Sequence, residues 1–180
     1  MKVLKVIVIV VIILIALLLI VALFVKKDYK VERSVSITKP SDSVFNYVKF
    51  VKNQDNFSVW NNLDPNMKKD YKGTDGTVGF VYAWDSQNKQ AGKGEQEISN
   101  IQEGKEIDMK LRFKKPMESE SDAYIITEHI DSTTTKVTWG IKGKMPYPFN
   151  IMCLFMNMDK TIGGDLSKNL DNLKVLLEKK

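Results

Sequence analysis

Few residues of this chain have the type and spacing that acid–base chemistry requires. His129 is the only histidine and Cys153 the only cysteine. His129 shares one face of an expected strand with Thr127 and Asp131, so it could act as a base beside an acid. A lone histidine is more often a solvated or structurally satisfied residue. Nothing in the sequence brings His129 to Cys153, which has the character of a small buried hydrophobic residue.

The acidic residues and glycines do not complete a site either. Glu118, Glu120 and Asp122 alternate along one expected strand, and three like charges at this period are typical of a solvated face. His, Cys and Asp residues nowhere occur at the close spacing of metal ligands, so we predict no metal and no cofactor. Gly92-Lys93-Gly94 lacks the Ser or Thr and the flanking pattern of a phosphate-binding loop.

The strongest pattern in the chain is a continuous apolar segment from Val6 to Val25. Twenty helical residues at about 1.5 Å each span about 30 Å, the thickness of the hydrocarbon core of a bilayer. The run is too long for a signal peptide and no small-residue cleavage site follows it. A buried core helix would keep a polar face, which this segment lacks. We therefore predict a single-pass anchor with basic flanks over residues 1–27 and a soluble domain over residues 28–180.

The charges say little about which side of the membrane the domain occupies. The amino terminus, Lys2 and Lys5 precede the apolar run, against Lys26, Lys27, Lys30 and Arg33 after it. This balance gives only a slight preference for a cytoplasmic domain. A single-pass protein of the bacterial inner membrane is the corresponding expectation.

The net charge of the chain is +5, and +3 remains for residues 26–180, from 25 basic against 22 acidic residues. The basic residues are interspersed with acidic ones and form no concentrated face, so we exclude nucleic acid as a partner. One cysteine cannot form an internal disulfide, which excludes a disulfide-stapled scaffold.

Alternating apolar and polar residues predict a series of strands after the apolar segment. A helix capped by Ser41 or Asp42 and a second short helix or loop near Lys52–Trp60 follow the first of them. Short turns between successive strands favour an antiparallel meander. The expected strands are Tyr29–Ile37, Met67–Lys72, Thr77–Trp84, Gly92–Gln102, Ile107–Phe113, Ser119–Ile130 and Thr134–Lys144.

The end of the chain changes to a helical period. Leu166, Leu170, Leu173 and Leu177 recur at steps of three and four residues, which predicts an amphipathic helix over residues 149–178. Gly163-Gly164 interrupts this stripe at a cost of about 1 kcal/mol per glycine relative to alanine. We expect a kink there, or a close contact with the sheet.

This order of elements, and several short motifs within it, resemble a known superfamily over residues 29–180. The stretch Glu32–Pro40 followed by Val44-Phe45 is similar to the opening of START-like proteins, also called SRPBCC or polyketide cyclase-like. Trp60 stands where such proteins commonly place a tryptophan. Several further stretches are similar to those of a membrane-anchored bacterial subgroup of this superfamily. They are Leu63–Met67, Gly92–Gly94, Val137–Gly140, and Gly143–Pro146 leading into Asn150–Met152.

The resemblance implies an α+β helix-grip fold. In that fold, a curved antiparallel sheet of six to seven strands wraps a long C-terminal helix, here preceded by one transmembrane helix. A cavity between sheet and helix binds lipids, sterols or polyketides in relatives. Strand parity and the inner face of the helix give the candidate pocket residues Phe80, Tyr82, Trp84, Met109, Leu111, Phe113, Trp139, Met152, Phe155 and Met156. Apolar residues at these periods can equally form a filled core.

Three functions remain open at this point. The first is a non-enzymatic, membrane-anchored binding protein for a hydrophobic small molecule or lipid. The second is an enzyme of cyclase or hydrolase type, with Tyr82, His129 or an acidic residue as proton donor; it requires a polar group of strongly shifted pKa in the cavity. The third is a protein-interaction module of co-chaperone type, which requires an exposed apolar patch on a filled domain. The sequence identifies no protein partner.

Overall fold

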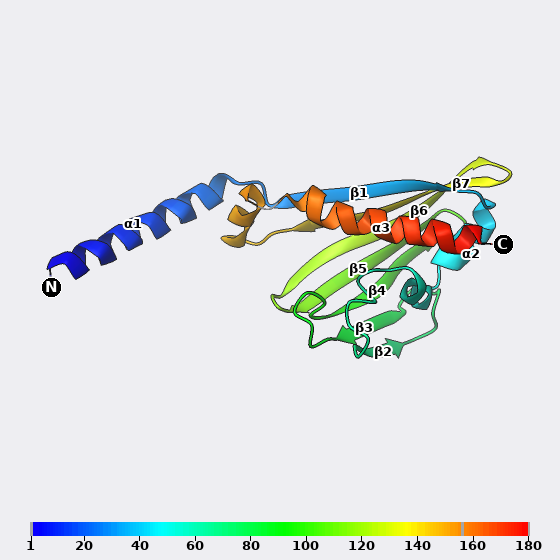
Figure 1. The fold of residues 1–180 in the computed structure, drawn as a ribbon, viewed down its shortest axis with the longest axis horizontal. Coiled ribbons are helices and arrows are strands. Elements are labelled where there is room, and N and C mark those ends of the chain that lie inside the picture. The colour runs from blue at the N-terminus through cyan, green and yellow to red at the C-terminus, as the bar shows by residue number, and fades with distance from the viewer. Residues whose placement is uncertain (1, 156, 180) are drawn as a thin grey trace.

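The computed structural model describes residues 2–155 and 157–179, and Figure 1 shows a long helix joined to a domain of sheet and helices. The first helix, α1, covers Lys2–Phe24. It is followed by β1 (Asp28–Ile37), α2 (Ser41–Val48) and a short 3₁₀ helix, η1 (Val51–Asn56). Pro40 precedes α2, and no side chain caps that helix, contrary to the cap expected from Ser41 or Asp42.

Six further strands complete one antiparallel sheet in the order β1-β7-β6-β5-β4-β3-β2. They are β2 (Lys68–Lys72), β3 (Val81–Asp85), β4 (Lys93–Gln102), β5 (Glu106–Lys115), β6 (Ser119–Asp131) and β7 (Thr134–Lys144). Register shifts interrupt the ladders of β4 with β5 and of β6 with β7. Such irregularities bend strands, and the sheet in Figure 1 is curved. The predicted antiparallel meander is confirmed, with β1 added beside β7.

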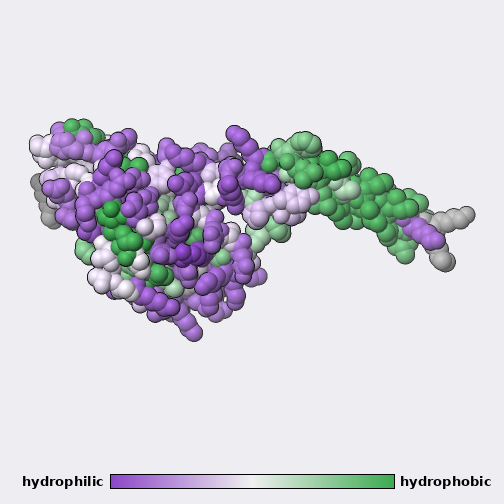
Figure 2. Space-filling view, turned by 180° about the vertical axis from the view of Figure 1, so that it is seen from behind, coloured by the Kyte–Doolittle hydropathy of each residue, from purple (hydrophilic) through white to green (hydrophobic). Residues whose placement is uncertain are grey.

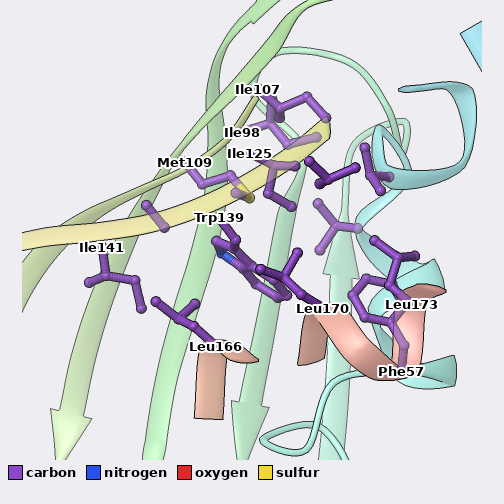
Figure 3. Packing of buried hydrophobic residues seen from close by; sticks show 14 of the residues in the cluster. Phe57, Ile98, Ile107, Met109, Ile125, Trp139, Ile141, Leu166, Leu170 and Leu173 are labelled. Atoms are coloured by element: carbon purple, nitrogen blue, oxygen red, sulfur yellow. The ribbon is translucent and has the colours of Figure 1, made fainter. Parts of the chain in front are cut away.

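The last helix, α3 (Met158–Glu178), lies along the concave face of the sheet (Figure 1). Its Leu166, Leu170 and Leu173 are buried against the sheet, and Figure 3 shows them beside Trp139 and Phe57. Burial of these leucines is the main stabilisation of the helix on the sheet, at about 25 cal/mol per Å² of apolar surface. The helix-grip architecture predicted from the sequence is confirmed.

The predicted bounds of the C-terminal helix were wrong. Residues 149–154 form a separate 3₁₀ helix, η2 (Phe149–Leu154), and α3 begins only at Met158. Asn157 has extended backbone angles, and its side-chain oxygen accepts a hydrogen bond from the backbone N–H of Lys160 at 2.9 Å. This cap starts a new helix, because it satisfies a donor that a continuing helix would have paired with its own backbone.

The glycine pair within α3 marks a close contact with the sheet, one of the two alternatives expected. A Cβ on Gly163 would lie 2.2 Å from Nη2 of Arg33, which belongs to β1, whereas a Cβ on Gly164 meets nothing within 4 Å. Arg33 donates two hydrogen bonds to the carboxylate of Asp159, at 2.9 and 2.8 Å, in the first turn of α3. Gly163 therefore gives Arg33 the room to fasten the start of α3 to β1.

The helix α1 extends away from the domain, and its apolar surface is exposed along nearly its whole length (Figures 1 and 2). Of the helices in the described part of the chain, one, over Val3–Phe24, is long and apolar enough to cross a membrane. Its carboxyl-terminal half lies against η2, and Ala22 is fully buried there.

Candidate ligand-binding cavity

A cavity of about 240 Å³ lies between the sheet and α3. Its walls come from six strands, the chain around and after η1, and Ile162 of α3. The lining residues are Tyr29, Gln54, Trp60, Asn61, Leu63, Met67, Tyr82, Trp84, Gln90, Ala91, Gln96, Met109, Leu111, Phe113, Ser121, Ala123, Trp139, Ile141 and Ile162.

The register places this cavity at the end of the sheet that adjoins α1. Tyr29, which lines it, follows Val25 by four residues and pairs with Gly143 near the end of β7. Gly143 pairs in turn with Ser121, near the start of β6, and Ser121 with Leu111. The Oη of Tyr29 and the Oγ of Ser121 are 2.9 Å apart and share a hydrogen bond. The other end of the sheet is filled by the core around Ile98, Ile107 and Ile125 (Figure 3).

Six of the ten candidate pocket residues line this cavity. They are Tyr82, Trp84, Met109, Leu111, Phe113 and Trp139. Phe80 is buried and stacks with Tyr71, their ring centroids 6.2 Å apart, but it is not among the lining residues. It precedes β3, which begins only at Val81 rather than at Thr77 as expected.

Of the three candidates placed on the inner face of the C-terminal helix, the two that the structure describes do not occupy that position. Met152 belongs to η2 and, with Pro148, lines a groove whose other wall is α1, including Leu18. Phe155 is 81 % exposed and is not among the described residues that line the cavity. Met156 lies outside the described residues. For Met152 and Phe155 the error follows from the single long helix expected over residues 149–178, because Met152 belongs to the separate η2 and Phe155 directly follows it.

The polar lining residues were missed from the sequence. Gln54, Asn61, Gln90 and Gln96 lie in or between the expected elements, and strand parity was applied only to apolar residues. The alternation of the strand could have predicted one of them, because Gln96 stands between Gly94 and Ile98 on the buried face of β4. A glutamine on a buried strand face requires a partner or a ligand.

Among the described residues, three polar groups of the lining have only a sulfur atom as hydrogen-bond acceptor. The side-chain amide of Gln96 donates to the Sδ of Met109, and the side-chain amide of Gln54 lies 4.0 Å from the same sulfur. The hydroxyl of Tyr82 donates to the Sδ of Met67 at 3.6 Å. A thioether is a weak acceptor. A ligand oxygen would therefore be a better partner for these donors than the one the protein supplies.

Trp139 forms part of the cavity wall and is held by two aromatic neighbours. Its ring centroid lies 6.0 Å from that of Phe57 and 5.8 Å from that of Trp60, both edge-on. The Nε1 of Trp60 donates to Asp165 of α3 at 3.2 Å. The Nε1 of Trp139 is buried and has no acceptor among the described residues. Figure 3 shows this nitrogen on the side of the ring that faces Ile141.

An aromatic row from β3 to β5 forms a second wall. Trp84 lies between Tyr82 and Phe113, with ring centroids 5.8 and 5.9 Å away. Its Nε1 donates to the carbonyl of Ala91 at 3.0 Å, which fixes the loop between β3 and β4. A Cβ on Gly94 would lie 2.6 Å from the Trp84 ring, so only glycine allows the indole to lie against β4.

Two loops that contribute Leu63 and Ala91 to the lining are joined by Asp64. Ser86 donates a hydrogen bond from its hydroxyl to the Asp64 carboxylate, and the side-chain amide of Asn88 donates to the carbonyl of Leu63 at 3.1 Å. The bond from Ser86, followed by one from the backbone N–H of Asn66, holds the pKa of Asp64 below its ordinary value. The ionised carboxylate therefore stabilises the two loops at the cavity edge.

Of the expected acid–base residues, Tyr82 is the one that the described part of the chain places in the cavity wall. Every described residue that lines it is uncharged. Burial, with a smaller effect of the Asp55 charge, raises the pKa of Tyr82 well above its ordinary value, so its hydroxyl is a weaker acid than a free tyrosine. His129 is exposed on β6 and pairs with Thr135 at the opposite end of the sheet. Within the described ranges, no three His, Cys, Asp or Glu residues are grouped as metal ligands.

Comparison with known proteins gives similarity in structure alone. No protein-family model matches the chain, and no curated protein is similar to it in sequence. Norcoclaurine synthase from Thalictrum flavum, solved with dopamine and hydroxybenzaldehyde, superposes with a TM-score of 0.64 at 10 % identity, covering 89 % of this chain and 94 % of the synthase. A protein from Chromobacterium violaceum superposes with a TM-score of 0.58 at 11 % identity, and the match covers 84 % of this chain and 98 % of that protein.

A third solved structure, Ara h 8.0201, superposes with a TM-score of 0.51 at 14 % identity, covering 81 % of this chain and 97 % of its own. At these identities the similarity shows the fold and no more. It agrees with the SRPBCC-like architecture expected from the sequence, whereas the membrane-anchored subgroup stays a prediction.

Proposed function

We propose that this chain is a membrane-anchored binding protein that holds a hydrophobic small molecule, or part of a lipid, between the sheet and α3. The observation that carries the proposal is the cavity itself, which is lined by uncharged residues and whose buried donors lack a good acceptor. Mostly apolar walls with a few placed polar groups are characteristic of small-molecule sites.

The volume of the cavity limits the size of this ligand. About 240 Å³ is slightly below the common range of roughly 300–1,000 Å³ for drug-sized ligands, and above the roughly 150 Å³ that suffices for benzene. A molecule of one or two rings, or a segment of one lipid chain, fits this space. The structurally similar synthase was solved with dopamine and hydroxybenzaldehyde, each of one aromatic ring.

The polar groups of the lining limit its chemistry. Gln96 and Tyr82 are donors, and the weak acid Tyr82 keeps its proton at neutral pH. A ligand with a carbonyl or ether oxygen would accept from them. The expected ligand is therefore an apolar molecule with at least one oxygen acceptor and no charge, because no charged residue of the described lining would balance one.

The helix α1 supplies the reason for placing such a protein at a membrane. Residues 1–27 form the proposed single-pass anchor and residues 28–180 the binding domain. A tether raises the local concentration of a ligand that partitions into the bilayer. The bacterial inner membrane, with the domain on the cytoplasmic side, is the location that we propose from the flanking charges.

The other two functions gain no specific support. A cyclase or hydrolase would use Tyr82 or His129 as proton donor, but the Tyr82 pKa is shifted against that role and His129 lies far from the cavity in the register. A co-chaperone-like module was expected to have a filled interior, whereas this domain has a cavity.

Native mass spectrometry of the full chain, released from detergent, tests the proposed function. Ala123 lines the cavity from the centre of β6, so Ala123→Leu reduces the available space at its wall. We expect a co-purifying mass of small-molecule or lipid size on the unmodified chain and its loss from A123L. Equal retention by A123L, or no bound mass on a correctly folded chain incubated with a lipid extract, would contradict the proposal.

A further inference from the structure

The segment Met145–Phe155, which contains η2, has no charged residue and is packed against the end of α1. Asn150 is fully buried there, and its side-chain amide donates to the carbonyl of Ala22 at 2.6 Å and to that of Val25 at 3.0 Å. The hydroxyl of Tyr147 donates to the carbonyl of Leu19 at 3.4 Å. The carbonyl of Ala22 is one of the last four of α1, which lack partners within the helix, so Asn150 caps α1 there, whereas Tyr147 bonds a carbonyl further inside the helix.

These contacts lie inside the apolar run, not beyond it. At about 1.5 Å per residue, Ala22 is about 4.5 Å and Leu19 about 9 Å before Val25, where the run ends. If α1 spans a bilayer, then residues bonded to these carbonyls lie at a similar depth. Amphipathic segments at membrane surfaces are buried by roughly 5–10 Å.

The side chains of the segment fit that depth. Leu154 is 57 % and Phe155 81 % exposed, and Tyr147, Phe149 and Met152 are also exposed in the absence of a membrane. An apolar groove of about 220 Å³ runs between η2 and the Ile15–Leu19 stretch of α1. Figure 2 shows the apolar surface of α1 continuing to the end of the domain that it joins.

The backbone of the segment also suits an apolar medium, in which unpaired polar groups are costly. Pro146 and Pro148 have no N–H to satisfy. Asn150 donates its backbone N–H to the carbonyl of Pro146 at 3.0 Å, Ile151 to Pro148 at 3.2 Å, and Phe155 to Met152 at 3.0 Å.

Charged residues flank the segment at the level expected of lipid headgroups. Lys26 and Lys27 follow α1 and are exposed, and Met145 donates its backbone N–H to the carbonyl of Lys27 at 2.8 Å. Lys144 directly precedes the segment and is exposed as well. Lysines at this level are attracted to anionic lipids.

We infer that residues 145–155 insert into the bilayer beside α1 as a second, non-spanning membrane element. This inference rests on the proposed anchor. Lipid is the occupant that fits the exposed apolar face, because the face is continuous with the apolar surface of α1 and carries no charge for a protein partner to pair with. The insertion holds the cavity end of the sheet, with Tyr29 and Ser121, at the membrane surface, so that a ligand can pass directly from lipid to cavity.

Site-specific fluorescence quenching tests this inference, and the single native cysteine simplifies the design. Three variants of the full chain in a Cys153→Ser background carry one cysteine each: Phe155→Cys in the segment, Ile12→Cys within α1, and Ser132→Cys in the exposed β6–β7 turn. Each is labelled with an environment-sensitive fluorophore and reconstituted into vesicles of phosphatidylcholine and phosphatidylglycerol. The vesicles carry nitroxide groups on their acyl chains.

We expect the F155C and I12C labels to be quenched several-fold more strongly than the S132C label. Quenching of F155C no greater than that of S132C, with I12C strongly quenched, would overturn the inserted segment and leave the anchor intact. Weak quenching of I12C would overturn the anchor, and the inserted segment with it. Native Cys153, labelled in the unmodified chain, gives a second position within the segment and should behave as F155C does.

Discussion

The two adjacent glycines of α3 should respond in opposite ways to the same substitution. Gly163→Ala places a Cβ 2.2 Å from Nη2 and 2.5 Å from Cζ of Arg33, so the guanidinium has to move. Gly164→Ala places its Cβ where no atom lies within 4 Å. Both changes remove a glycine from a helix, which by itself stabilises the fold by about 0.5–1 kcal/mol.

The difference between the variants then measures the fastening of α3 to β1. Moving Arg33 breaks its two hydrogen bonds to the Asp159 carboxylate and a third, at 3.1 Å, to the Asp159 carbonyl. The two side chains are 32 % and 66 % exposed, so solvent screens this ion pair, and crowding of the guanidinium by the new Cβ is the larger cost. We expect G164A to be more stable than the unmodified chain, and G163A to be less stable than G164A by about 1 kcal/mol, the lower end of the cost of overpacking.

Thermal unfolding of the full chain in detergent, followed by near-ultraviolet circular dichroism, measures this difference. About 1 kcal/mol corresponds to roughly 2–4 °C in Tm for a domain of this size. In an Arg33→Ala background the two alanine variants should have the same Tm, because the group that crowds Gly163 is gone. Equal stability of G163A and G164A in the unmodified background would refute the role assigned to Gly163.

Three further predictions concern the cavity and the carboxylates. Gln96→Leu should lower the affinity for 2-acetylnaphthalene, which has a carbonyl oxygen, relative to that for 2-ethylnaphthalene, which has none. The expected change in the ratio of the two affinities is about two- to tenfold, the value of one neutral hydrogen bond. Titration of the unmodified chain and the variant in nanodiscs with each ligand measures this ratio, and an unchanged ratio would exclude a contact between the amide and the ligand. Trp84→Ala should reduce the binding free energy of either naphthalene by more than it reduces the free energy of unfolding derived from the Tm. Equal losses of the two free energies would indicate a purely structural residue. Hydrogen bonds from Ser86 and from Arg33 lower the pKa values of Asp64 and Asp159 below 3.8, so their stabilisation is complete above that pH and is lost as the pH falls through the lowered values. The Tm should therefore fall as the pH drops below about 3.8, and it should fall less steeply for Asp64→Asn.

Much of the fold was predictable because its signals are local. The apolar run of α1 and the period-two alternation of the strands are properties of neighbouring residues, and each needs only the chain itself to be read. Parity also assigned Met109, Leu111 and Trp139 to the concave face, on which the structure places them around the cavity.

The candidate site depended on information that parity lacks. Alternation tells which face a residue occupies but not how far along the strand the cavity extends, so Phe80 and Trp84 could not be distinguished. The polar donors Gln54 and Gln96 meet at Met109 from η1 and β4, a juxtaposition created by the fold alone.

The sequence by itself determined that an apolar helix precedes a domain of seven strands and a final helix, since each element buries its apolar residues at its own period. Only the tertiary structure decided where that final helix begins, that Phe155 faces outward, and that Asn150 joins η2 to α1. The start of α3 has a local cap at Asn157, but its first turn is also bonded to Arg33 of β1, and η2 is bonded to α1 through Asn150 and Ala22. Both of these contacts join residues more than a hundred positions apart in the sequence, and no local pattern encodes such pairs.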